Sequence, residues 1–294
     1  MKVLNFGSLN VDYVYQVDHM VMPGETQSSS GMEIFLGGKG FNQSVALVKA
    51  GVPVYHAGLI GEDGTAFVEA AKAYGMHTDF IKKIDGRSGH TIIQVDKNGQ
   101  NCILLHGGSN RAITKEFVDF VMEHFEAGDI ILLQNEVSEM PYIIDKAYER
   151  GMQIFLNPSP YDAYLDACDM SKVSCFFMNE IEGGLISGGE TDPDKIIEKV
   201  LEKYPDARIV LTLGGDGSIY ADKNERHHQE IFKVETVDTT AAGDTFTGYF
   251  IAGIINGTPI KETLRMSALA ASITVSRPGA TPSIPYMEEV QKML

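Results

Sequence analysis

The sequence predicts an α/β protein with a doubly wound, mostly parallel sheet, covered by helices on both faces, and a small β-sheet lid. Two observations support this fold class. From residue 114 onward, short apolar runs alternate with helical patterns, which is typical of right-handed crossovers between parallel strands. Before residue 114, several short runs do not continue this alternation, and two of them flank Asn98-Gly99, a strong hairpin signal.

The chain has 294 residues, of which 44% are hydrophobic. This length and composition suit one large domain with a sizeable core. We therefore expect a single domain over residues 1–294. The lid strands should be inserted in it at about 11–36 and 88–107.

Glycine and proline signals bound the individual elements. Gly51 and Gly75 are placed to end helices at 41–50 and 65–74, and Pro193 stands at the first position of another helix. Further helices are expected at 115–125, 141–150, about 163–170, from about 180, 193–204, 243–255, 261–275 and 286–293. The main sheet should contain 3–7, 54–59, 130–134, 153–157, 175–178 and 208–213, then antiparallel strands at 218–221 and 230–234. The lid should contain 11–17, 32–36, 90–95 and 102–106.

Polar or glycine residues follow many of the expected strands at the point where each strand ends. They are Asn10, Gln134-Asn135-Glu136, Asn157, Asn179 and Gly214-Gly215. Ligands of open parallel sheets bind outside the carboxyl ends of the strands. We therefore expect a site at this edge.

The composition excludes several classes of partner. The net charge is −16, which disfavours nucleic acid and anionic membrane surfaces as partners. No apolar run is long enough to span a bilayer, and the N-terminal run is too short for a signal peptide. Cys102, Cys168 and Cys175 are odd in number and lack CxxC spacing, so a reduced, cytoplasmic compartment is expected.

The segment Ala241-Ala242-Gly243-Asp244 opens an apolar helix. The first N–H groups of a helix lack internal partners, and the helix dipole adds partial positive charge there. The three small residues let an anion approach these N–H groups, with the Asp244 carboxylate beside them. Phosphoryl transfer to a hydroxyl needs both such donors and a base. A helix start whose acid merely complements the dipole is the alternative interpretation.

Seven motifs along the chain resemble the ribokinase family of sugar kinases, the phosphofructokinase-B type. They are Gly7-Ser8-Leu9-Asn10-Val11-Asp12, Pro23-Gly24-Glu25-Thr26, Gly37-Gly38-Lys39-Gly40-x-Asn42, Asn179-x-x-Glu182, Thr212-Leu213-Gly214-Gly215-Asp216-Gly217, Asp238-Thr-Thr-Ala-Ala-Gly-Asp244 and Gly279-Ala280-x-Pro282-Ser283. The resemblance covers essentially the whole chain. It implies an ATP-dependent kinase with a ribokinase-like fold, in which Asp244 is the catalytic base and Ala241, Ala242 and Gly243 form the anion hole.

The resemblance also implies which residues hold the sugar. Asn10 and Asp12 would bind its hydroxyls, and a site built to hydrogen-bond hydroxyls penalises analogues that lack them. The other implied sugar contacts are Gly37, Gly38, Lys39, Asn42 and Glu136.

The nucleotide and Mg²⁺ are assigned in the same way. Asn179 and Glu182 would organise Mg²⁺ through water, which suits an ion that keeps several waters; read alone, the pair is more often a helix cap. The nucleotide would contact Thr212, Gly214, Gly215 and Gly217, a stretch that reads equally as a tight turn, and Ser267 would lie near the adenine.

A monovalent cation, K⁺, is implied near the anion hole. The positions that align with its site are Asp238, Thr240, Thr274, Arg277, Gly279 and Ser283. Several of these ligands would be backbone carbonyls.

Phe41 departs from the family pattern, which usually has alanine before this asparagine. A phenyl ring there could fill the sugar site, stack on a ring larger than ribose, or point into the core. The adjacent His227 and His228 do not suggest a metal site, because neighbours on a strand face opposite ways.

The resemblance, with Asn10, Asp12 and Lys39 in place, favours a kinase that converts D-ribose to ribose 5-phosphate. A kinase for another sugar or a nucleoside is the alternative, and a non-catalytic sugar-binding descendant is a further one. An oxidoreductase would need G-x-G-x-x-G after the first strand, where Gly7-Ser8-Leu9-Asn10 stands instead. An exposed lid edge often pairs with its twin, so a homodimer through the lid is expected.

Overall fold

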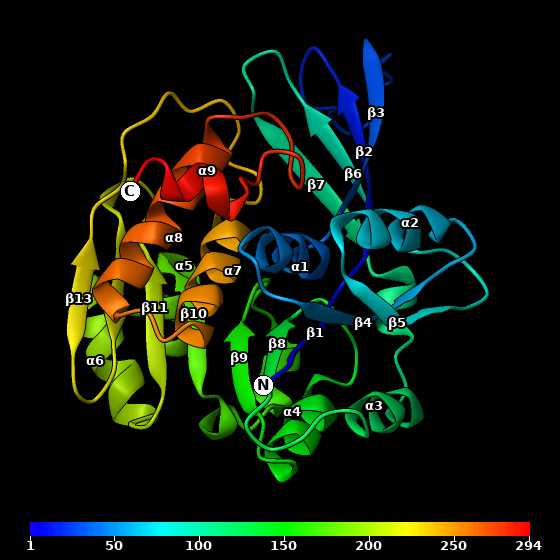
Figure 1. Cartoon of the computed structure of the whole chain (residues 1–294). Helices are drawn as coiled ribbons and strands as arrows, with labels where there is room; N and C mark the ends of the chain where they lie inside the picture. The colour runs from blue at the N-terminus through cyan, green and yellow to red at the C-terminus, as the bar shows by residue number, and fades with distance from the viewer.

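The computed structural model describes residues 1–294 as two sheets with helices packed around the larger one (Figure 1). The main sheet has nine strands in the order β13-β12-β11-β10-β9-β8-β1-β4-β5. In chain order their bounds are β1 Val3–Phe6, β4 Val54–Ile60, β5 His77–Lys83, β8 Ile130–Gln134, β9 Gln153–Asn157, β10 Cys175–Asn179, β11 Arg208–Thr212, β12 Ser218–Ala221 and β13 Arg226–Gln229. The pairs from β5 to β11 are parallel, and β12 and β13 are added antiparallel.

Helices cover both faces of this sheet because its strands are apolar on both sides. Ile130 and Leu132 of β8 join one core cluster, and Ile131 and Leu133 join the other. Helices α1 Lys39–Lys49, α2 Thr65–Tyr74, α7 Ala242–Ile255 and α8 Ile260–Val275 contribute to the first cluster. Helices α3 Lys115–Met122, α4 Met140–Glu149, α5 Glu180–Ile186 and α6 Pro193–Lys203 contribute to the second, and the short α9 Met287–Gln291 packs with the first.

The lid is a separate sheet with the strand order β3-β2-β6-β7. Its strands are β2 Asn10–Gln16, β3 Gly31–Gly37, β6 Gly89–Val95 and β7 Asn101–His106. Figure 1 shows the lid standing apart from the main sheet, beyond the carboxyl end of β1. Asn10 pairs with Gly37 on one side and Gly89 on the other, so these three residues form the base of the lid.

The fold class and the lid predicted from the sequence are confirmed, and several details differ. The helix expected at 286–293 is the shorter Met287–Gln291, and the helix expected at 41–50 begins at Lys39. Strand β5 was not predicted. The expected strand at 230–234 is wrong, because the strand that pairs with β12 is Arg226–Gln229. The expected helix at 163–170 is two 3-10 turns, Ala163–Ala167 and Met170–Lys172, and α3 ends at Met122 rather than 125. No helix combines the length and apolar composition that crossing a bilayer requires.

Candidate active site

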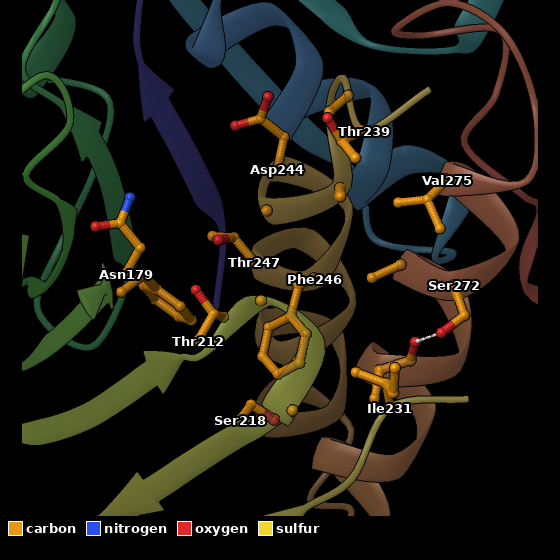
Figure 2. A pocket seen from close by; sticks show the side chains of 18 of the residues that line it. Asn179, Thr212, Ser218, Ile231, Thr239, Asp244, Phe246, Thr247, Ser272 and Val275 are labelled. Atoms are coloured by element: carbon orange, nitrogen blue, oxygen red, sulfur yellow. Dashed lines mark hydrogen bonds between the residues drawn. The ribbon is translucent and has the colours of Figure 1, made fainter. Parts of the chain in front are cut away.

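A cavity of about 900 Å³ opens at the carboxyl ends of β9, β10 and β11, the edge predicted from the sequence. Figure 2 shows Asp244 at the first turn of α7, with Asn179 and Thr212 on the strand side and Ile231 and Ser272 on another wall. The volume lies within the range of small-molecule and cofactor sites.

The start of α7 presents three unpaired N–H groups to this cavity. Ala241 precedes the helix with φ 60°, a left-handed conformation that turns the chain sharply. The Ala242 N–H donates to the Thr239 carbonyl at 3.3 Å, and the first full helical bond runs from Thr245 to Ala241. The N–H groups of Ala241, Gly243 and Asp244 have no acceptor, and all three residues line the cavity. Of the predicted anion-hole residues, Ala242 is therefore the one whose N–H is already engaged. Such a helix start fits a phosphate.

Two amides of α1 hold the Asp244 carboxylate. Asn42 Nδ2 donates to Oδ2 at 3.0 Å, and Gln43 Nε2 donates to Oδ1 at 2.9 Å. The helices approach closely because Gly248 of α7 faces Ala46 of α1, where an added Cβ would lie 2.5 Å from the alanine Cβ. Both carboxylate oxygens are therefore fixed in position, and each keeps a lone pair for a further donor.

Glycines at the start of α1 bring its backbone against β1. Gly38 has φ 92°, a conformation that glycine adopts without penalty. A Cβ on Gly40 would overlap the backbone of Gly7 and Ser8. The side chains of Lys39 and Asn42 are thereby placed beside Asp244, a contact that the sequence did not predict. The Asn42 Oδ1 atom is buried and has no partner.

The implied sugar-binding groups gather where the lid meets the main sheet. Asn10 Oδ1 accepts from Asn110 Nδ2 at 2.7 Å, which leaves the Asn10 NH₂ group free to donate. Asp12 Oδ1 accepts from Thr91 Oγ1 at 2.5 Å, and a Cβ on Gly37 would overlap Asp12 Oδ2. Burial raises the pKa of Asp12 to about 6, although the Thr91 hydrogen bond opposes the rise.

Lys39 lies among three carboxylates. Burial alone would lower the pKa of Lys39, but the charges of Asp244, Glu136 and Glu182 outweigh this and raise it. Glu136 accepts from the Lys39 N–H at 3.0 Å and from the Ser8 hydroxyl. Burial raises the pKa of Glu136, against the opposing charge of Lys39. Lys39 thus links the sugar side to the cavity, whose wall it lines.

On the wall of the cavity formed by β10 and α5, Asn179 and Glu182 form a capping box at the start of α5. Asn179 donates to both Glu182 oxygens, at 3.0 Å from its N–H and 3.2 Å from its side chain. One lone pair on each oxygen remains for a metal-bound water. Both residues line the cavity, as do Thr212 and the glycine turn that follows it.

The glycines of this turn divide into two kinds. A Cβ on Gly214 or Gly215 would meet nothing within 4 Å, so the backbone is open to a ligand there. Gly217 has φ 94°, and a Cβ on it would overlap the Gln229 carbonyl. Gly217 therefore serves the turn between β11 and β12, in agreement with the turn interpretation.

Ser267 does not face the cavity. It is fully buried, and its hydroxyl donates to the Thr263 carbonyl at 2.8 Å. Ala268, Ala271 and Ser272 of the same helix line the cavity instead, because successive residues of an α-helix point in different directions. The structure gives Ser267 no place beside an adenine ring.

The predicted cation positions lie in the segment before α7, in the last turn of α8 and in the segment after α8. Asp238 Oδ1 accepts from the Thr240 N–H at 2.9 Å, and its Oδ2 accepts from the Gly279 N–H at 2.9 Å. Arg277 pairs with Glu289 at 2.7 Å. The hydroxyls of Thr274 and Ser283 donate to helix and turn carbonyls. Asp238 thus ties the segment before α7 to the segment after α8.

Phe41 is a core residue. It is fully buried, and its ring packs edge-on against Phe67 at 5.2 Å and against His56 and Tyr74 at 6.5 Å. Of the three alternatives for Phe41, the structure shows the one in which its ring points into the core. His227 and His228 lie on the edge strand β13.

Sequence reasoning missed the residues that hold the predicted ones. The only sequence feature that could have indicated Gln43 is that it directly follows Asn42 of a motif. Asn110, Thr91 and Ser8 act through Asn10, Asp12 and Glu136; Asn110 follows no motif in the sequence.

Comparison with known proteins gives consistent relatives. The model of the pfkB family carbohydrate kinases matches residues 1–287. A ribokinase from Staphylococcus aureus (strain COL) is 33% identical over 303 residues, covering 99% of each chain. A deoxyribokinase from Salmonella typhi is 28% identical over 302 residues, covering 100% of this chain and 99% of its own.

Solved structures agree with these relatives. The ribokinase of Thermotoga maritima superposes with a TM-score of 0.89 at 33% identity, covering 99% of this chain and 98% of its own. A ribokinase from Arabidopsis thaliana, solved with ribose and ATP, superposes with a TM-score of 0.87 at 28% identity, with the same coverage.

Proposed function

The chain belongs to the pfkB family of carbohydrate kinases, and on this premise we propose that it transfers the γ-phosphoryl group of ATP to D-ribose, giving ribose 5-phosphate. One observation carries the proposal. The Asp244 carboxylate lies beside the unpaired N–H groups of α7, between the cavity and the sugar-binding groups. The ribokinases among its relatives support ribose as the acceptor.

In this reaction the acceptor hydroxyl gives its proton to Asp244. The oxygen of the acceptor hydroxyl forms a bond to the γ-phosphorus while the bond between the γ-phosphorus and the β,γ-bridging oxygen breaks. ADP leaves with the electron pair of the broken bond. A carboxylate is a weak base for an alcohol. It suffices when the proton moves late in a loose transition state, where the protein mainly positions groups and neutralises charge. The Gly243 and Asp244 N–H groups would take the charge on the phosphoryl oxygens.

The sugar side suits a neutral polyol. Asn10 offers an NH₂ donor and Asp12 an acceptor, while Glu136 adds a second carboxylate. Lys39 is already shared among carboxylates, and the sugar motifs contain no further Arg/Lys cluster, so an acceptor carrying its own phosphate would find no matching pair of cations. The lid closing over the sugar would exclude water as a competing acceptor.

Two metal ions complete the proposed site. Asn179 and Glu182 would hold Mg²⁺ through water, and Mg²⁺ supplies charge neutralisation on the phosphates. The loop that Asp238 ties to Gly279 would hold K⁺ behind the anion hole, with backbone carbonyls as ligands.

The lid supports a homodimer. Ile34, Ile103 and Leu104 are 56%, 58% and 67% exposed on its two outer strands, and exposed apolar edges favour pairing. Sedimentation that finds only a monomer at micromolar concentration would remove this proposal.

The three cysteines form no disulfide, which supports the proposed cytoplasmic compartment.

The test is ATP-dependent ADP release with a panel of sugars and nucleosides, in the presence of Mg²⁺ and K⁺, with Asp244→Asn as the control. Turnover with D-ribose that is lost in the control is the expected result. A higher kcat/KM with 2-deoxyribose would keep the mechanism and move the specificity toward the deoxyribokinase relative. Absence of turnover with every acceptor would refute the catalytic proposal and favour a sugar-binding protein.

A further inference from the structure

A chain of buried amides leads away from Asp244 into the sheet. Gln43 donates to Asp244 Oδ1 at 2.9 Å, and its own Oε1 accepts from Gln134 Nε2 at 2.6 Å. Gln134 also donates to Asn5 Oδ1 at 3.0 Å. Asn5, Gln43 and Gln134 are fully buried, and none of them lines the cavity.

The direction of every amide in this chain is determined by a backbone carbonyl. Asn5 Nδ2 donates to the Gly40 carbonyl at 2.7 Å, and a carbonyl can only accept. Asn5 must therefore turn its oxygen toward Gln134, which must turn its NH₂ toward both Asn5 and Gln43. Gln43 is then left with its NH₂ facing Asp244.

A second anchor fixes the same orientation from the opposite side. Gln43 Nε2 also donates to Asn157 Oδ1 at 3.2 Å, and Asn157 Nδ2 donates to the Phe177 carbonyl at 2.8 Å. An inverted Gln43 amide would face two acceptors with its oxygen, Asp244 Oδ1 and Asn157 Oδ1. Both anchors thus require the arrangement in which Gln43 donates to the carboxylate.

We propose that Gln43 is a positioning residue for the Asp244 base and that Gln134 acts through it. This inference rests on the proposed function and deepens it. Gln43 keeps Asp244 Oδ1 in place, so that the remaining lone pairs of the carboxylate stay directed at the acceptor hydroxyl. Gln134 touches neither the base nor the cavity, and its role is to hold the Gln43 amide in place through Oε1, while Asn157 holds it through Nε2.

The proposal is tested with Gln43→Met, Gln134→Met and the double variant, assayed for kcat and for KM with ribose and with ATP. Removing a donor to a charged group should lower kcat about 10- to 100-fold in Gln43→Met, and Gln134→Met should lower it by a smaller factor. Both KM values should stay within about twofold, because neither side chain contacts a substrate. The double variant should be no slower than Gln43→Met, since residues that act through one another are not additive.

Asp129→Asn is the matched control for lost stability. Asp129 precedes β8, at the end opposite Gln134, and is buried with hydrogen bonds to the N–H groups of Lys2 and Glu126. It should lower the melting temperature and leave kcat unchanged. If Gln134→Met does not fold, Gln134→Asn keeps the amide but withdraws it from Gln43 and serves the same comparison.

A second readout does not depend on activity. The side-chain amide resonance of Gln43 should shift in Gln134→Met and stay in place in Asp129→Asn. Multiplied losses of kcat in the double variant, a change in KM rather than kcat, or an unmoved Gln43 resonance would overturn the proposal. If the wild-type protein shows no turnover but the Gln43 resonance shifts in Gln134→Met, the proposed reaction is refuted and the coupling between the two amides stands.

Discussion

Gly243→Ala should make the protein more stable and much less active. Gly243 is the second residue of α7, its φ is not in the left-handed region, and a Cβ there would meet no atom within 4 Å. Nothing in the fold therefore opposes the added methyl group. The open space that receives it is the cavity beside the unpaired N–H groups.

The two effects have different physical origins. Glycine within a helix costs about 0.5–1 kcal/mol relative to alanine, so the melting temperature should rise by about 1–3 °C for a chain of this size. The methyl group would hold a phosphoryl group away from the Gly243 and Asp244 N–H groups. Displacement by about 1 Å, or loss of one such donor, costs about 10²-fold in rate.

The measurement is thermal unfolding of the free protein together with steady-state ADP release. Gly215→Ala is the comparison, because its Cβ also has open space and it lines the nucleotide end of the cavity; it should raise KM for ATP more than it lowers kcat. Unchanged kcat in Gly243→Ala would refute the assignment of these N–H groups to the phosphoryl oxygens. A lower melting temperature would refute the account of the turn.

Three further predictions follow from buried groups. Gly37→Ala should raise KM for the sugar at least tenfold with little change in KM for ATP, because the new Cβ would overlap Asp12 Oδ2; equal effects on both substrates would contradict this. Phe41→Ala should lower the free energy of unfolding by about 3–5 kcal/mol and leave the order of preference among sugars unchanged in the acceptor panel, whereas a new preference would restore Phe41 to the sugar site. Burial lowers the pKa of His56 to about 4, below its ordinary value of about 6.5. The unfolded chain therefore binds the proton more tightly than the folded protein. As the pH falls from about 6.5 to about 4, the free energy of unfolding should decrease by up to about 3 kcal/mol. Urea unfolding at pH 7, 6 and 5 should show this loss, and His56→Gln should flatten it; parallel curves for the two proteins would count against a buried neutral His56.

The elements that the sequence misplaced are those whose pairing depends on distant or polar contacts. The apolar residues around Ile231 suggested a strand at 230–234, but the strand is the polar Arg226–Gln229. A tight turn decides this, because Asp222 Oδ1 accepts from the N–H groups of Asn224 and Glu225 and sets the register of β13 against β12. Ile231 follows the end of β13 and lines the cavity. Strand β5 was missed because an edge strand with exposed polar residues lacks a hydrophobic period.

The sequence by itself determined the alternation of strands and helices, the lid hairpin and the position of Asp244 at the start of α7. These features depend on periodicity, glycine placement and short spacings, which act between neighbours in the chain. Only the tertiary structure decided that Phe41 points into the core, that Ser267 faces away from the cavity and that Gln43 binds Asp244 across 201 positions. Side-chain direction and long-range hydrogen bonds depend on how helices pack against the sheet, and local sequence patterns do not specify that packing.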